Sequence, residues 1–284
     1  MKINVTPSEL ATETLTPSHL QRAVNAILED GYVVLANVVN HACLDILRER
    51  MDADSQELIV AQKWGGAGHV EGHLQQGPPP FSPYVHRDIV ANPFTIQVSH
   101  ALLGDGFYNR FYNGNCNCPG SGTQPLHADG PHIWKDLPIA HPPVSLVINV
   151  SPVETTEENG ATEIWPGTHR IPNIQNPISP AQEAARREIV PPVRAVAPKG
   201  GLVIRDMRLW HRGVPNHSDR IRHMIAMVYQ SGWMARERKM LYHQDCVDQF
   251  PESALDHNAE FTNRPIEYLY VRFPQVKAGS TASG

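Results

Sequence analysis

The spacing of four polar residues constrains the fold of this chain more than any other feature. His127 and Asp129 are separated by one residue, and His211 and Arg222 follow much later in the sequence. On an extended strand, residues i and i+2 point to the same side, so one strand can direct an imidazole and a carboxylate at the same point. A distant segment must then bring His211 to that point. The pattern therefore predicts a fold in which strands far apart in the sequence meet at one site.

Two imidazoles and one carboxylate form the facial triad of non-haem Fe(II) oxygenases, in which the protein leaves one face of an octahedral ion open. His127, Asp129 and His211 are therefore candidate metal ligands and catalytic residues. The same side chains would also suit a zinc hydrolase, in which a metal-bound water is the nucleophile, or a cupin-like metal-binding protein without turnover. A residue that binds an organic anion beside the triad would favour the oxygenase over both alternatives.

Arg222 is the candidate for that anion-binding residue. It begins a long strand on which Met224, Ala226 and Val228 share its face by the period of two. A guanidinium on an otherwise apolar face needs a partner, because an unpaired buried charge is very costly. Either a protein carboxylate or a dicarboxylate cosubstrate bound bidentately would meet that need. Arg220 has the same parity but lies nearer the turn, where we expect it to be solvated.

The expected secondary structure begins with helices and continues with short strands. Thr16-Pro17 is a good helix start and Gly31 a helix end, and a strand over residues 32–39 and a helix over 41–60 follow. Residues 62–90, rich in Gly, Pro and His, predict a long loop. From residue 93 onward, short strands with Gly and Pro turns predict a β-sandwich or barrel. It would include strands at 144–150 and 220–230 and a hairpin at 195–204, with helices at 178–188 and after Met234.

Composition restricts the partners of the chain. Its 284 residues suffice for one large domain or two small ones, and a net charge of −5 gives no basic excess for nucleic acid. There is no apolar run of about 20 residues for a membrane span and no signal peptide at the N-terminus. The four cysteines are too sparse for a disulfide scaffold, and Cys116-x-Cys118 has no second pair to complete a zinc knuckle. We expect a cytoplasmic protein of undetermined oligomeric state that acts on a small molecule.

Three ordered motifs carry a resemblance to a known family. They are residues 124–130 (QPLHADG), 159–170 (NGATEIWPGTHR) and 210–216 (WHRGVPN), and Arg222 follows His211 by 11 residues. Over most of residues 16–232 the chain resembles the phytanoyl-CoA dioxygenase family of Fe(II)/2-oxoglutarate-dependent oxygenases. The resemblance implies a mainly β (α+β) fold, a double-stranded β-helix (jelly roll, cupin-like) with N-terminal and peripheral helices. It implies a single domain over 1–284, with outer helices and a first strand in 1–60, a core at about 93–232 and a flexible tail at 276–284.

The resemblance also implies roles for individual residues. His127, Asp129 and His211 would bind Fe(II), while Arg222 would bind the distal carboxylate of 2-oxoglutarate. Gln124 and, less directly, Thr168 would contact the same cosubstrate, although Thr168 also suits a simple turn. The implied reaction consumes O₂ and 2-oxoglutarate, with ascorbate as a possible support, and releases succinate and CO₂ as a C–H bond is oxidised. Halogenating relatives carry a small residue in place of the carboxylate, so Asp129 disfavours halogenation.

The substrate is the part of the function that the motifs leave open. His132, Trp134 and His73 are candidate pocket residues and His69 a candidate lid residue, although each could be an ordinary loop residue. One of Asn113, Asn115 and Asn117 could face the site, but asparagines are also common in turns. Few basic residues cluster near the motifs, so a CoA thioester is not specially indicated. We expect hydroxylation of a small metabolite, such as a natural-product intermediate, with desaturation, ring expansion and endoperoxidation as alternatives.

Overall fold

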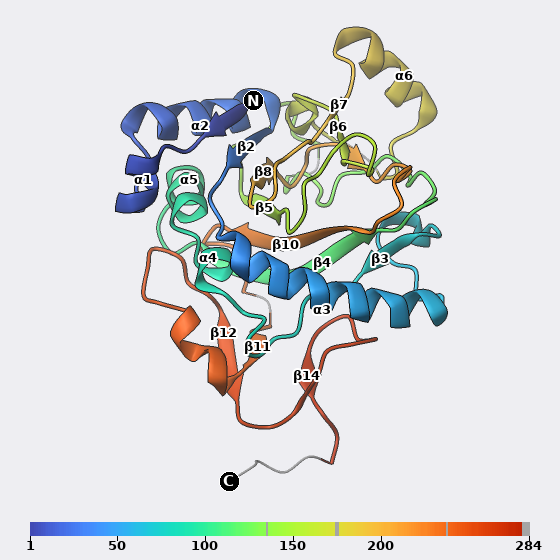
Figure 1. Ribbon diagram of the computed structural model, residues 1–284. Helices are drawn as coiled ribbons and strands as arrows, with labels where there is room; N and C mark the ends of the chain where they lie inside the picture. Colours follow the sequence, from blue (N-terminus) through green and yellow to red (C-terminus); the bar gives the residue numbers. More distant parts are fainter. Residues whose placement is uncertain (135, 174–175, 237, 280–284) are drawn as a thin grey trace.

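The computed structural model describes residues 1–279 except 135, 174–175 and 237 (Figure 1). The helices are α1 (Pro7–Thr12), α2 (Pro17–Asp30), α3 (His41–Val60), α4 (Arg87–Val90), α5 (Pro93–Leu103) and α6 (Pro180–Ile189), with 3-10 turns η1 (Ala67–His69), η2 (Thr168–Arg170) and η3 (Gln244–Gln249). The strands are β1 (Lys2–Asn4), β2 (Tyr32–Ala36), β3 (His73–Gln75), β4 (Tyr108–Asn117), β5 (Ser145–Val150), β6 (Glu163–Ile164), β7 (Val193–Arg194), β8 (Leu202–Asp206), β9 (His211–Arg212), β10 (Arg222–Gln230), β11 (Met240–His243), β12 (Ala259–Thr262), β13 (Ile266–Glu267) and β14 (Gln275–Val276).

The architecture is α+β, built on a large mixed sheet. Seven strands lie in the order β1-β2-β8-β5-β10-β4-β3, in which β1 runs parallel to β2 and the other neighbours are antiparallel. A smaller sheet has the order β7-β6-β9. In Figure 1, α3 runs alongside β10 and β4, whereas β6 and β7 lie near α6, away from α3. The cavity described below is lined from both sheets, so it lies between them.

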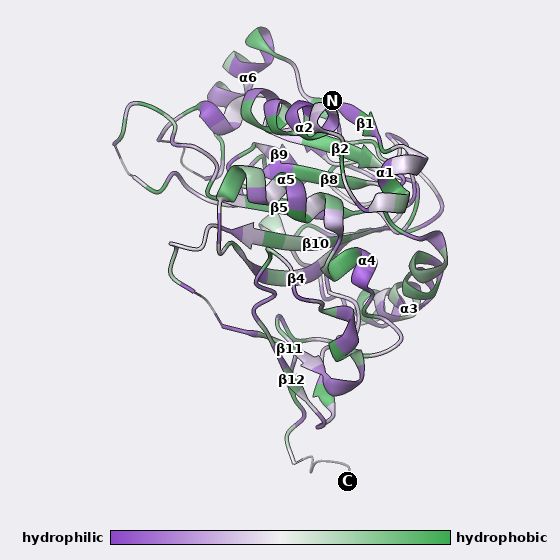
Figure 2. Ribbon diagram, turned by 90° about the vertical axis from the view of Figure 1, so that its left-hand side faces the viewer, coloured by the Kyte–Doolittle hydropathy of each residue, from purple (hydrophilic) through white to green (hydrophobic). Residues whose placement is uncertain are grey.

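Alternation along the central strands divides the large sheet into a helix-packed face and a cavity face. On β5, Leu146 and Ile148 pack in the main hydrophobic core, whereas Val147 and Asn149 line the cavity. All six residues of β5 are buried, because both faces of the sheet are covered. Figure 2 shows β2, β8 and β5 as mostly hydrophobic strands. The helices complete the core with apolar side chains of α2, α3 and α5: Ala23, Ala26, Ile27, Leu44, Leu47, Met51, Leu58, Phe94, Ile96, Val98 and Leu103.

Several sequence predictions are confirmed by this fold. The helix that starts after Thr16 is α2: the Thr16 side chain accepts a hydrogen bond from the His19 amide, and Gly31 ends the helix with a φ of +87°. Helix α3 spans the predicted residues 41–60, and α6 lies within one or two residues of the predicted 178–188. The strands predicted at 144–150 and 220–230 are β5 and β10. The strand predicted over 32–39 is β2, which ends earlier, at Ala36.

Four predictions are wrong. Residues 93–103 form helix α5 rather than strands, because Asn92 caps the helix and Pro93 occupies its first position. Residues 195–204 are no hairpin: Ala197 bridges to Thr155, whereas β8 pairs with β2 and β5. Residues after 234 form β11, η3 and short strand pairs instead of an α-helix. The segment 62–90 is not entirely loop, since it contains β3 and α4.

At the start of the segment that is predicted as a flexible tail, Val276 pairs with Ile266 and the Lys277 amide donates to the Pro265 carbonyl. Residues 280–284 of that tail lie outside the described residues. Among the described residues, no helix is both long and apolar enough to cross a membrane.

Candidate active site

The three predicted metal-binding side chains converge on one point. His127 and His211 lie opposite each other in an antiparallel bridge, in which each backbone amide donates to the other carbonyl at 3.1 and 2.8 Å. Asp129 is fixed two residues later, where its amide donates to the Met207 carbonyl at 3.1 Å. The candidate ligand atoms of the three side chains all lie within 4.8 Å of one another. Small side-chain movements would bring all three within about 2 Å of one ion, the bond length expected for such ligands.

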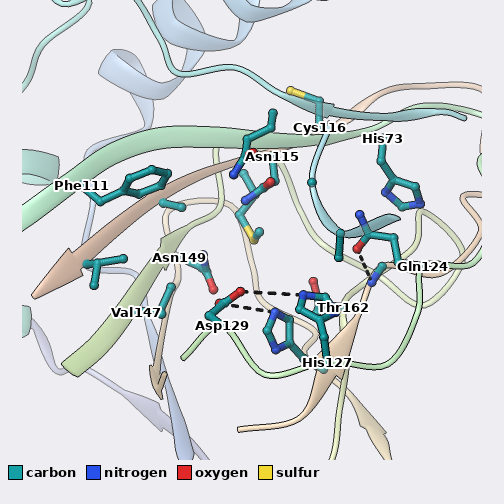
Figure 3. A pocket seen from close by; sticks show the side chains of 18 of the residues that line it. His73, Phe111, Asn115, Cys116, Gln124, His127, Asp129, Val147, Asn149 and Thr162 are labelled. Carbon is teal, nitrogen blue, oxygen red and sulfur yellow. Dashed lines mark hydrogen bonds and ion pairs between the residues drawn. The ribbon is translucent and has the colours of Figure 1, made fainter. Parts of the chain in front are cut away.

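Backbone hydrogen bonds set the tautomer of both histidines. The Nδ1 atom of His127 lies 2.8 Å from the Pro125 carbonyl, and Nδ1 of His211 lies 3.0 Å from the Leu209 carbonyl. A carbonyl can only accept, so each Nδ1 must carry the proton and each Nε2 is left with a free lone pair. The Nε2 atoms face Asp129, at 3.7 Å from its Oδ1 for His127 and 3.5 Å from its Oδ2 for His211. This arrangement suits a divalent cation, and Figure 3 shows His127 directed at Asp129.

Electrostatics keep Asp129 and His211 in the states that bind metal. Burial acts to raise the pKa of the Asp129 carboxyl, but electrostatic interactions with His211, Arg205 and His127 outweigh it and hold the pKa far below its usual range. Burial, reinforced by the Arg205 charge, lowers the pKa of His211 to about 3. At neutral pH the carboxylate is therefore ionised and the His211 imidazole is neutral, so neither must lose a proton when a metal binds.

The triad opens into a cavity of about 280 Å³ between the two sheets. Met224, Ala226 and Val228 line it together with Arg222, which confirms that the predicted face of β10 is shared. Among the described residues, four arginines and one carboxylate line this cavity: Arg110, Arg205, Arg222, Arg272 and Asp129. The cavity is therefore electropositive and suits organic anions.

Arg222 is buried, with 4% of its surface exposed, and its guanidinium is largely unpartnered. Its Nη2 donates to the Gly160 carbonyl at 3.2 Å, while Nε and Nη1 have no hydrogen-bond partner. No carboxylate of the described residues forms an ion pair with it, so the alternative of an internal salt bridge is not found. Burial lowers the pKa of Arg222 to about 10, and the side chain stays charged at neutral pH. A guanidinium binds a carboxylate bidentately through Nη2 together with Nε or Nη1, and Nη2 keeps a second N–H besides the one donated to Gly160, so a two-pronged pair remains open.

Gln124 and His73 lie on the same side of the cavity. Gln124 accepts a hydrogen bond from the Gly213 amide at 2.9 Å, and His73 Nε2 lies 2.7 Å from the Gly122 carbonyl. Burial, together with the charge of Arg222, lowers the pKa of His73, which is therefore neutral. Gly213 is required between them, because a Cβ there would lie 2.6 Å from His73 Cε1 and 2.7 Å from Gln124 Oε1. Both residues line the cavity, as does the predicted candidate Asn115 (Figure 3).

Four other candidates lie outside the cavity. Thr168 is fully buried, and its hydroxyl donates to the Trp165 carbonyl and accepts from the Trp210 amide, so it holds the motif together instead of facing a cosubstrate. His132 packs against the His141 ring, and Trp134 stacks on Trp233 at the surface with 47% of its area exposed. His69 is exposed and lies near the Trp64 carbonyl through its Nδ1. The cavity lining thus includes Gln124 and His73 but not Thr168, His132 or Trp134.

Sequence reasoning missed several residues that line the cavity. Thr162, in the same motif as Thr168, is the threonine that faces it. Arg205 of β8 donates to Asp129 Oδ2 at 2.5 Å and to Asn149 Oδ1 at 3.3 Å. Phe111 and Phe273 form an edge-to-face pair with ring centroids 6.4 Å apart, so the C-terminal segment supplies part of the wall. Arg205 lies on the same face of β8 as Val203, and a charged residue on such a face can indicate a site. The sequence around both positions, however, predicts only a buried strand.

An α+β fold gathers two histidines, an aspartate and a buried arginine around one cavity, and a set of two histidines and one carboxylate is typical of non-haem metal oxygenases. A model of the phytanoyl-CoA dioxygenase (PhyH) family matches residues 27–224, which is more than half of the chain. The chain therefore belongs to the phytanoyl-CoA dioxygenase family. The family predicted from the three motifs is therefore confirmed.

Relatives of similar sequence are fungal dioxygenases. Dioxygenase af480 of Aspergillus fumigatus is 28% identical over 211 residues, which cover 69% of this chain and 63% of the relative. Dioxygenase andF of Emericella variicolor is 28% identical over 147 residues, 50% of this chain and 48% of the relative. Dioxygenase aneA of Aspergillus aculeatus is 25% identical over 232 residues, 76% of this chain and 74% of the relative. The chain thus matches less than two thirds of the length of the first two.

A solved structure shares the fold. The crystal structure of SnoN, a non-haem α-ketoglutarate-dependent epimerase from nogalamycin biosynthesis, superposes with a TM-score of 0.56 at 17% identity. The match covers 76% of this chain and 82% of SnoN. At this identity the likeness supports the fold alone.

Proposed function

We propose that His127, Asp129 and His211 hold Fe(II), and that the enzyme couples oxidation of 2-oxoglutarate to hydroxylation of a C–H bond in a small metabolite. Succinate and CO₂ would be released, with O₂ as the oxidant and ascorbate as an aid in keeping the iron reduced. We also propose that the chain is one domain and that the two sheets form the double-stranded β-helix expected from the sequence. The likeness to SnoN supports that fold.

The buried, unpartnered guanidinium of Arg222 carries the proposal. A zinc hydrolase or a metal-storing protein would have no use for two free cationic donors in the same cavity as its metal ligands. A 2-oxoglutarate-dependent enzyme requires them, because the far carboxylate of the cosubstrate must be bound while its other end reaches the metal. Gln124 and His73 lie beside this end of the cavity, and the Gln124 amide oxygen is already occupied by Gly213.

Each residue then has a physical task. The backbone-fixed tautomers of His127 and His211 and the ionised Asp129 present three lone pairs to one ion. Bound Fe(II) would supply the oxygen activation that the protein's own side chains cannot. Arg222 would orient 2-oxoglutarate by a bidentate pair, and the buried setting strengthens that pair by excluding water. Because Asp129 occupies the third ligand position, we propose hydroxylation rather than halogenation.

The substrate we propose is a small metabolite, such as an intermediate of natural-product biosynthesis. SnoN, with which the chain shares the fold, comes from a pathway of this kind. Desaturation or rearrangement of the same substrate would use the same ligands and cosubstrate. The product of the reaction, rather than the ligand set, therefore distinguishes hydroxylation from these outcomes.

A metabolite-library screen tests the proposal. The enzyme is supplied with Fe(II), ascorbate, 2-oxoglutarate and O₂, and succinate is measured with and without each compound. We expect at least one compound to stimulate succinate formation in the wild type, with a product 16 mass units heavier, and none to do so in Asp129→Ala. Succinate formation that does not require 2-oxoglutarate, or turnover supported by Zn(II) alone, would contradict the proposal.

A further inference from the structure

A second set of unpartnered donors lies in the cavity, on the other side of the triad from Gln124. Arg205 and Asn149 are both 5% exposed and both line the cavity. Arg205 Nη1 and Asn149 Nδ2 are buried without a hydrogen-bond partner in the described part of the chain. A buried donor left without an acceptor is costly, so such groups usually await a ligand or ordered water. The four cavity donors therefore form two groups, one on Arg222 and one on this pair.

The pair is held rigidly by its other hydrogen bonds. Arg205 Nη2 donates to Asp129 Oδ2 at 2.5 Å, and Arg205 Nε donates to Asn149 Oδ1 at 3.3 Å. The Asn149 amide oxygen is thus occupied, which directs its Nδ2 away from Arg205. Both residues belong to adjacent strands, since β5 pairs with β8 with Val147 opposite Arg205. The free Nη1 of Arg205 consequently belongs to the same guanidinium that binds Asp129, a proposed iron ligand, and the Asn149 side chain is hydrogen-bonded to that guanidinium.

The surroundings of the pair are apolar. In Figure 3, Asn149 lies on one side of Asp129 with Val147 and Phe111 beyond it, whereas Gln124 and His73 lie on the other side. Ala226 and Val228 line the same cavity from the neighbouring strand β10. With 2-oxoglutarate on the Arg222 side, this second part of the cavity is left for the substrate. It offers apolar walls and, beside the metal ligands, two donors.

We propose that Arg205 and Asn149 bind a carbonyl or carboxylate oxygen of an otherwise apolar substrate and so hold the neighbouring carbon at the metal. This inference rests on the proposed function and extends it to the chemical class of the substrate. Both groups are donors without a free acceptor, so they select an oxygen acceptor and disfavour a hydrocarbon. The positive cavity, lined by four arginines and one carboxylate, is compatible with a neutral carbonyl or an anion.

Three probes with one carbon skeleton test the inference: 1-indanone, indane-1-carboxylate and indane. Their dissociation constants are measured by saturation-transfer NMR on the chain loaded with Zn(II), which is diamagnetic, and 2-oxoglutarate. We expect the wild type to bind the ketone or the carboxylate at least about tenfold more tightly than indane, as a buried hydrogen-bond site discriminates. In Asn149→Leu, which keeps the charge of Arg205 but removes the amide donor, the constants of the neutral ketone and of indane should fall within about threefold of one another.

Two further variants make the result specific. Asn149→Asp keeps the acceptor for Arg205 but removes the donor and adds a negative charge, so it should weaken binding of the carboxylate more than binding of the ketone. Asn25→Leu, the same change at an exposed position of α2 outside the cavity, should keep the wild-type preference. A wild type that does not prefer either oxygenated probe, or an Asn149→Leu variant that keeps the preference for the ketone over indane, would overturn the inference and assign the donors to water. Binding of 2-oxoglutarate, measured on every variant, reports separately on the proposed function and on folding.

Discussion

Replacement of Arg222 by alanine should greatly weaken 2-oxoglutarate binding and leave metal binding nearly intact. The side chain is 4% exposed, and Nε and Nη1 have no partner within the described chain, so Nη2 together with one of these two atoms would give both bonds to the cosubstrate carboxylate in a desolvated setting. Truncation of one partner of such a buried charge pair costs about 2–5 kcal/mol. At 1.4 kcal/mol per factor of ten, the dissociation constant should rise by about 30-fold to about 4,000-fold. Arg222 contacts none of the three metal-binding side chains, so metal affinity should change little.

Isothermal titration calorimetry under anaerobic conditions measures both quantities. Fe(II) is titrated first, and 2-oxoglutarate is then titrated into the loaded protein. Arg220→Ala is the matched control, because Arg220 lies two residues earlier in the sequence and is exposed. Arg222→Lys should show an intermediate loss, since it keeps the charge but not the two-pronged geometry. If Arg222→Ala binds 2-oxoglutarate within about threefold of the wild type, Arg222 does not bind the cosubstrate. If Arg220→Ala loses as much 2-oxoglutarate affinity as Arg222→Ala, the loss is not specific to Arg222.

Three other predictions concern the ligand set, Thr168 and the N-terminal helix. Asp129→Ala should lower substrate-stimulated succinate formation by at least about 100-fold, and it should also lower the melting temperature of the metal-free protein, because it leaves the buried Arg205 guanidinium without its carboxylate partner; normal turnover would remove Asp129 from the ligand set. Thr168→Val should lower the free energy of unfolding in urea by about 1–3 kcal/mol, since it leaves the buried Trp210 amide without its acceptor, yet 2-oxoglutarate affinity should stay unchanged. Burial acts to raise the pKa of Glu9, but hydrogen bonds from Thr6 and Thr16 outweigh it and hold the pKa at about 2. The stability that the ionised Glu9 provides is therefore complete above pH 4.5 and is lost as the pH falls toward 2. Glu9→Gln should therefore be less stable than the wild type at pH 7 by about 1–3 kcal/mol, with a smaller difference at pH 3.5, and an equal difference at both pH values would contradict this assignment.

The residues that converge on the site were predictable because their chemistry is unusual for their position. An H-x-D pair at the end of a strand and an arginine on an apolar strand face each require a partner, and that requirement can be read from one sequence. Helix α2 was predictable for a similar reason, since Thr16, Pro17 and Gly31 mark its ends locally. In such cases the signal lies within a few residues of the feature that it predicts.

Other features depend on contacts between distant segments. The sequence of α5, PFTIQVSHALL, is apolar on most sides because the helix is buried between other elements. It therefore lacks the helical period, and such a run cannot be distinguished by periodicity from a buried strand. Arg205 and Asn149 lie within runs whose neighbours are buried on both faces, so alternation gives no sign of the cavity face.

Two further errors concern register and the C-terminal segment. Thr162 and Thr168 occur in one motif, and only the fold decides which of them faces the cavity. The wall formed by Phe273 depends on its contact with Phe111, more than 150 residues earlier in the chain, which no local pattern records.

The central claim is that His127, Asp129 and His211 bind one metal ion, and anomalous X-ray scattering tests it most directly. Crystals of the chain grown anaerobically with Fe(II) and 2-oxoglutarate would be measured on either side of the iron absorption edge. We predict a single strong anomalous peak at about 2 Å from Nε2 of both histidines and from one Asp129 oxygen, in the cavity that holds Arg222. No peak at this position, or a peak held by other side chains, would contradict the facial-triad assignment and the function proposed from it.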